Sequence, residues 1–89
     1  MDLEIIRKEI DDVDDQIKIL FEKRMALVLE VAEYKKQNNL PVKNSTRENE
    51  ILVRVTTGQS EELAEYTKIL FRKLFEIARL YQERNINKE

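Results

Sequence analysis

The sequence predicts an all-α fold with three helices per chain, one long, one short and one of medium length, in an intertwined helical-bundle homodimer. Apolar residues recur at helical spacing, which is the primary signal for this class. Only one glycine and one proline occur in 89 residues, and each falls where a helix is expected to end. Charged residues make up 38% of the chain, a composition typical of solvated helix faces.

The first predicted helix starts near Asp2, whose carboxylate can cap the amides that follow, and runs to about Asn38. Its apolar residues form two seven-residue columns that together make a continuous buried seam. The columns are Leu3, Ile10, Ile17, Arg24 and Val31, and Ile6, Val13, Leu20, Leu27 and Tyr34. Arg24 is thus a cation in an apolar column. Burying an unpaired guanidinium is costly, so Arg24 requires an anionic partner.

The second helix is predicted from Thr46 to about Thr56, after a loop from Pro41 to Asn44. Residues 45–48, Ser-Thr-Arg-Glu, fit the S-x-x-E capping box of a helix N-terminus. The apolar face of this helix consists of Ile51, Leu52 and Val55.

A glycine-bearing turn at residues 57–60 leads to the third helix, for which Ser60 is the expected cap. This helix should end near Arg84, so that residues 1–84 form a single domain and residues 85–89 a polar C-terminal tail. Its apolar residues include Leu63, Tyr66, Leu70, Phe71, Leu74, Ile77, Ala78 and Tyr81.

The length of the first helix predicts the homodimer. At about 1.5 Å per residue, a helix of some 35 residues is roughly 50 Å long, more than the diameter of a compact domain of this size. Two shorter helices from the same chain cannot cover its seam. We therefore expect the long helices of two copies to pack together while the other helices wrap over both.

Composition excludes several classes of function. The chain has no cysteine and no histidine, which excludes disulfides, the usual zinc sites and Ser-His or Cys-His nucleophiles. Sixteen basic and eighteen acidic residues are interspersed, which argues against a nucleic-acid surface. The N-terminus lacks a signal-peptide core, and no stretch approaches the roughly 20 apolar residues of a membrane span. We expect a cytoplasmic protein that uses no cofactor or metal.

Arg24 and Lys35 are the strongest candidates for an anion site. They lie eleven residues apart, hence on nearly the same helix face and about 16 Å apart along the axis, so both side chains could hold one small anion. Two alternatives stay open: Arg24 could pair with a buried acid, and Lys35 alone could be a solvated lysine near a helix C-terminus. Arg7 lies about 25 Å before Arg24. It is a surface arginine or a contribution to the partner subunit's site.

Further polar candidates stand on the other two helices. Arg47 and Glu48 are placed near the free amides at the start of the second helix, where a ligand oxygen could bind, although a capping box alone would account for Glu48. Gln82 follows the apolar run of the third helix and, taken alone, would be a surface glutamine.

Together these residues closely resemble the all-α class of chorismate mutases, from about Leu3 to Gln82. The resemblance rests on the spacing of Arg7, Arg24 and Lys35 and on a set of matching segments. These are residues 6–11 (Ile-Arg-Lys-Glu-Ile-Asp), Asp14 with Leu20, residues 31–35 (Val-Ala-Glu-Tyr-Lys), residues 40–42 (Leu-Pro-Val), the pair Arg47 and Glu48, and Gln82.

The resemblance implies an intertwined homodimer with two identical sites that isomerise chorismate to prephenate by a Claisen rearrangement, in phenylalanine and tyrosine biosynthesis. It assigns the two substrate carboxylates to Arg24 and to Arg7 of the partner subunit. Lys35 would contact a carboxylate and the ether oxygen, and Gln82 would donate a second hydrogen bond to that oxygen. A concerted rearrangement needs no nucleophile or proton shuttle, which agrees with the absence of histidine and cysteine.

The resemblance also assigns four supporting positions. Glu48 would hold the substrate hydroxyl, and Arg47 would support the carboxylate-binding end. Asn44 stands where many members have Asp. Ala78 stands where many have Ser, and for this reason one hydroxyl contact to a carboxylate is expected to be missing.

Two other functions remain as alternatives. One is an isochorismate pyruvate lyase, which uses an equivalent lysine on the same scaffold. The other is a helical dimerisation module without catalysis, whose cations are paired internally.

Overall fold

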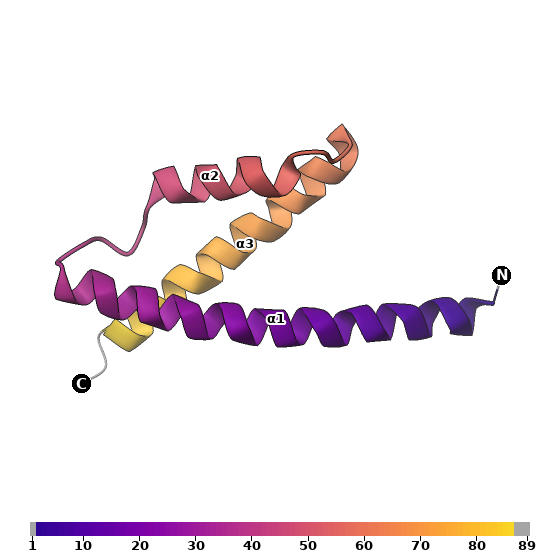
Figure 1. Cartoon of the computed structure of the whole chain (residues 1–89), viewed down its shortest axis with the longest axis horizontal. Helices are drawn as coiled ribbons and strands as arrows, with labels where there is room; N and C mark the ends of the chain where they lie inside the picture. Colours follow the sequence, from indigo (N-terminus) through magenta and orange to yellow (C-terminus); the bar gives the residue numbers. More distant parts are fainter. Residues whose placement is uncertain (1, 87–89) are drawn as a thin grey trace.

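The computed structural model describes residues 2–86. These form three α-helices, α1 (Leu3–Gln37), α2 (Ser45–Thr56) and α3 (Glu61–Ile86), and contain no strand, which confirms the predicted all-α class. In Figure 1, α1 is a straight rod, α2 turns back along it, and α3 crosses behind toward the C-terminal end of α1. Contacts join α3 to both other helices, so α3 holds the chain together.

Both ends of α1 are capped. At the start, the Asp2 carboxylate accepts a hydrogen bond from the Glu4 amide at 2.9 Å, as predicted. At the end, Asn39 adopts a left-handed backbone conformation with φ 53°, and the Leu40 amide donates to the Lys35 carbonyl at 2.8 Å. The Asn39 amide donates to the Lys36 carbonyl, which completes a Schellman motif. This motif stops α1 at Gln37.

The predicted capping box at the start of α2 is wrong. The cap is Asn44, whose side-chain oxygen accepts from the Arg47 amide at 3.0 Å, and Ser45 is already the first helical residue. Asn and Ser cap about equally well, so the helix can start at either. Because the start is one residue earlier than predicted, Glu48 lies one position beyond that of the box glutamate, and its carboxylate is engaged elsewhere.

The cap of α3 is the predicted one, since the Ser60 hydroxyl accepts from the Leu63 amide at 3.2 Å. The preceding turn requires a glycine, because Gly58 has φ 85°. At its other end α3 continues past Arg84 to Ile86, and the Asn85 amide donates to the Tyr81 carbonyl at 2.8 Å. Two residues of the predicted tail, Asn85 and Ile86, are thus helical, and residues 87–89 lie outside the described part.

The buried core is small and lies where the three helices meet. Its members are Ala32 from α1, Ile51 from α2, and Phe75, Ala78 and Gln82 from α3. The apolar seam of α1 before this region is uncovered, and Ile10, Val13, Ile17 and Leu20 are all more than half exposed. Figure 1 shows this half of α1 projecting away from the other helices. Within residues 2–86, no helix has the length and apolar character needed to cross a membrane.

Candidate functional site

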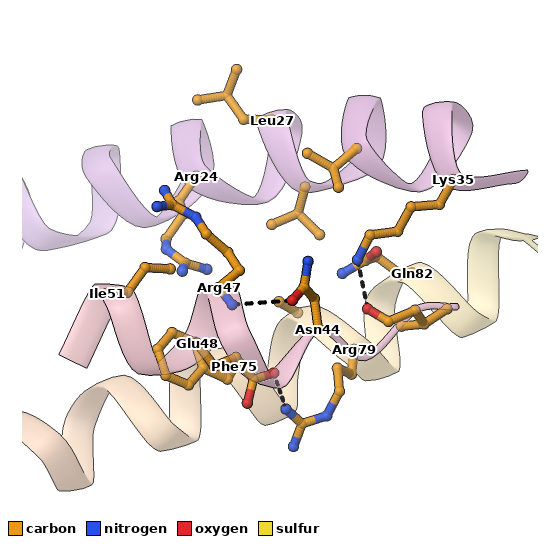
Figure 2. A pocket seen from close by; sticks show the side chains of 14 residues that line it. Arg24, Leu27, Lys35, Asn44, Arg47, Glu48, Ile51, Phe75, Arg79 and Gln82 are labelled. Carbon is orange, nitrogen blue, oxygen red and sulfur yellow. Dashed lines mark hydrogen bonds and ion pairs between the residues drawn. The ribbon is translucent and has the colours of Figure 1, made fainter. Parts of the chain in front are cut away.

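A cavity of about 280 Å³ opens between the C-terminal half of α1, the start of α2 and the C-terminal half of α3 (Figure 2). The structure brings to it every predicted site residue except Arg7, namely Arg24, Lys35, Asn44, Arg47, Glu48, Ala78 and Gln82. Arg7 is exposed on the projecting half of α1, about 25 Å from Arg24 along the axis. A single chain therefore assembles the cavity without Arg7.

Arg24 is partly buried in the wall of the cavity, and no carboxylate among the described residues forms an ion pair with it. Desolvation lowers the pKa of its guanidinium, and the positive charges of Arg47 and Arg54 lower it further. The environment thus disfavours the charge that Arg24 carries. Within residues 2–86 the alternative of an internal acid partner finds no support, and an anionic ligand would supply the missing counter-charge.

Lys35 reaches the cavity from the last turns of α1. Its ammonium donates a hydrogen bond to the carbonyl of Val42 at 2.6 Å, drawn as a dashed line in Figure 2. Burial lowers the pKa of Lys35, and the negative charge of Glu48 acts in the opposite direction. Lys35 is therefore a partly desolvated donor held by the loop, not the solvated lysine that its sequence position alone would indicate.

Glu48 is bound by a residue that sequence reasoning missed. Arg79 Nη1 lies 2.5 Å from Glu48 Oε2, and the two side chains retain only 28% and 23% exposure. The ion pair joins the first turn of α2 to α3. A signal for Arg79 was present, since it stands next to Ala78 and three residues before Gln82, on the edge of the same helix face.

Gln82 is 6% exposed, which corrects its reading as a surface glutamine. Its side-chain oxygen is buried without a hydrogen-bond partner among the described residues, although the amide lines the cavity. A buried amide with unused capacity is costly unless a ligand satisfies part of it. The unpaired oxygen can accept a hydrogen bond from a ligand donor, whereas the amide nitrogen of the same side chain is the group that can donate to a ligand oxygen.

The two departures from the family pattern also lie in the wall. Ala78 is buried and offers only a methyl group at the position where the resemblance led us to expect a hydroxyl. The Asn44 side chain is occupied in capping α2, as the dashed line to the Arg47 amide in Figure 2 shows.

The cavity combines an excess of positive charge with apolar walls. Arg24, Lys35, Arg47 and Arg79 outnumber the single carboxylate of Glu48, and Ile51 and Phe75 are among the apolar lining residues. Residues 2–86 contain no group of three or more side chains arranged to hold a metal ion. Such a site is suited to bind a small dianion and to stabilise negative charge that develops on it.

Two comparisons with known proteins agree with this geometry. The family model described as chorismate mutase type II matches residues 6–83. The chain is also 37% identical over 89 residues to a bifunctional chorismate mutase/prephenate dehydratase of Buchnera aphidicola subsp. Schizaphis graminum (strain Sg). This match covers 98% of the chain but 23% of the relative, so the chain spans about a quarter of that protein. No solved structure matches. The resemblance noted in the sequence is thus confirmed, and the chain belongs to the chorismate mutase type II family.

Proposed function

We propose that this protein is a chorismate mutase that converts chorismate to prephenate in the biosynthesis of aromatic amino acids. The observation that carries the proposal is the cavity itself. It gathers Arg24, Lys35 and Gln82, and the charge of Arg24 is left without a partner in the described chain. A dicarboxylate substrate would supply the missing negative charge.

The reaction is a concerted rearrangement in which the ether C–O bond breaks while a C–C bond forms. The protein must hold the folded conformer of the substrate and stabilise negative charge on the ether oxygen. In our proposal, Arg24 binds one carboxylate with support from Arg47. Lys35 and Gln82 donate to the ether oxygen, and Glu48 accepts a hydrogen bond from the substrate hydroxyl.

We propose further that the active form is a homodimer in which Arg7 reaches the partner's cavity. Two features support this assembly: the uncovered apolar seam along the N-terminal half of α1, and the exposed position of Arg7 on that same half. A second copy would bury the seam and bring the guanidinium of Arg7 to the carboxylate that a single chain leaves unbound.

The decisive experiment incubates the purified protein with chorismate and, separately, with isochorismate, and identifies the products. Prephenate from chorismate is the expected result. Pyruvate released from isochorismate, with chorismate unchanged, would establish the lyase instead. If neither substrate reacts and a dicarboxylate transition-state analogue causes no rise in the thermal midpoint, the protein is a non-catalytic module. The comparisons point to neither alternative.

A further inference from the structure

The Arg79–Glu48 ion pair lies in the cavity wall, and its geometry indicates a different role for each of the two residues. Glu48 uses Oε2 to accept from Arg79, and its other oxygen has no hydrogen-bond partner among the described residues. Figure 2 shows the Arg79 guanidinium on the side of Glu48 that faces away from Arg24 and Lys35. Arg79 therefore supports the carboxylate from behind.

Glu48 has a second cation within its electrostatic reach. Its charge acts on Lys35, and both side chains line the same cavity. A carboxylate between two cations can pair with either of them. In the structure Glu48 pairs with Arg79, and the Lys35 ammonium donates to the neutral carbonyl of Val42 instead. Lys35 is thereby left without an anionic partner in the described chain.

Which cation Glu48 pairs with is important, because an anionic ligand would bind to the positive charge of Lys35. If Glu48 turned to Lys35, the internal ion pair would compete with a bound anion for the ammonium. The carboxylate would also leave the position from which its free oxygen can accept a substrate hydroxyl. The guanidinium of Arg79 on α3 can form two hydrogen bonds to a carboxylate, and it gives Glu48 a fixed partner other than Lys35.

We propose that Arg79 is a positioning residue that holds Glu48 on the α3 side of the cavity and so keeps Lys35 available to the anionic substrate. This inference rests on the proposed function. Arg79 also lines the cavity, but its role in this proposal is to hold Glu48.

The test measures steady-state conversion of chorismate by the wild-type protein and by Arg79→Met, with and without Glu48→Gln. Arg79→Met should raise KM about tenfold and change kcat less than about threefold, because the released carboxylate competes with substrate for Lys35. In the Glu48→Gln background, adding Arg79→Met should change KM by less than about twofold relative to Glu48→Gln alone, since a neutral amide does not compete for the ammonium. Arg79→Lys, which retains the charge, should keep KM close to the wild-type value.

Matched controls separate positioning from folding. Lys73→Met removes a cation from an exposed ion pair on the same helix and should leave both constants unchanged. Urea denaturation monitors the stability of each variant, and Arg79→Gln is a second substitution with the same expected pattern.

Two results would overturn the inference while the wild-type protein is active. One is an unchanged KM in Arg79→Met and Arg79→Gln, and the other is an equal rise in KM with and without Glu48→Gln. Failure of the wild-type protein to convert chorismate would instead refute the proposed function, and the inference with it.

Discussion

Arg24 occupies a position where the pattern of α1 calls for an apolar side chain, and the fold gives it cationic neighbours instead of an acid. Its charge is opposed by desolvation, Arg47 and Arg54. Residues that serve a ligand commonly reduce the stability of the free protein in this way. The feature could be recognised in the sequence because a heptad column makes one polar exception visible.

Replacing this cation should therefore separate stability from function. Arg24→Leu is expected to raise the free energy of unfolding by about 1 kcal/mol and to lower kcat/KM at least about 100-fold. Urea denaturation and steady-state kinetics measure the two effects. Arg54→Gln, which removes a neighbouring charge outside the cavity, should give a smaller gain with activity retained. A loss of stability in Arg24→Leu would show that Arg24 has a structural partner.

Lys35 is the donor expected to act on the breaking bond. Lys35→Ala should reduce kcat about 10²–10³-fold, because a preorganised donor to the developing oxyanion is lost. Circular dichroism and sedimentation should show unchanged helix content and assembly. Lys36→Ala, at the exposed neighbouring position, is the matched control and should keep its activity. A near-normal kcat in Lys35→Ala would contradict the assignment.

The environment of Lys35 also predicts a pH dependence. Burial lowers its pKa below the ordinary value of 10.5, so kcat/KM should fall on the alkaline side as the ammonium loses its proton, at a pH below that value. A bound dicarboxylate favours the charged form, so the limb in kcat should lie at higher pH than the limb in kcat/KM. Lys35→Arg should abolish both limbs, since a guanidinium stays protonated. Limbs that persist in Lys35→Arg would belong to another group.

At the scale of the helices, local signals were sufficient for most boundaries. Asp2 and Ser60 cap α1 and α3 as predicted, because a cap depends on residues within one turn. The start of α2 was wrong because Asn44 and Ser45 are adjacent residues of equal capping strength. The place of Arg79 beside Ala78 indicated that it lies near the site, but its contact with Glu48 spans 31 positions of sequence and depends on how α3 packs against α2.

The corrected cap can be tested directly. Asn44→Ala should lower the free energy of unfolding by about 1 kcal/mol, and Asn44→Asp should preserve it, because either oxygen can accept from the Arg47 amide. Ser45→Ala is the matched control. It should have a much smaller effect on the urea midpoint, and an equal effect would restore Ser45 as the cap.

At the scale of the whole molecule, the sequence predicted the long first helix, and this helix makes the chain elongated. The described chain measures 54 × 29 × 14 Å, an elongated shape whose projecting half of α1 leaves apolar side chains exposed. Helix length followed from periodicity alone. The side-chain arrangement in the cavity did not, because it depends on how α3 crosses the other two helices.

Mixing two inactive variants tests the proposed exchange of Arg7 between subunits. In an Arg7→Ala and Lys35→Ala heterodimer, one site would combine both defects and the other would be intact. Co-refolding equal amounts should therefore recover about a quarter of the wild-type activity, since half of the dimers are mixed and each has one working site. If Arg7 served its own chain's cavity, mixing would recover no activity.

The loop between α1 and α2 holds Lys35 at two points. Its Leu40 amide binds the Lys35 backbone carbonyl, and its Val42 carbonyl binds the Lys35 ammonium. The segment thus acts as a tether of fixed length. Among related sequences, insertions and deletions should consequently be rare between residues 38 and 44, where any change of length would displace an ammonium. They should be common at residues 57–60, where the turn has no contact with the cavity.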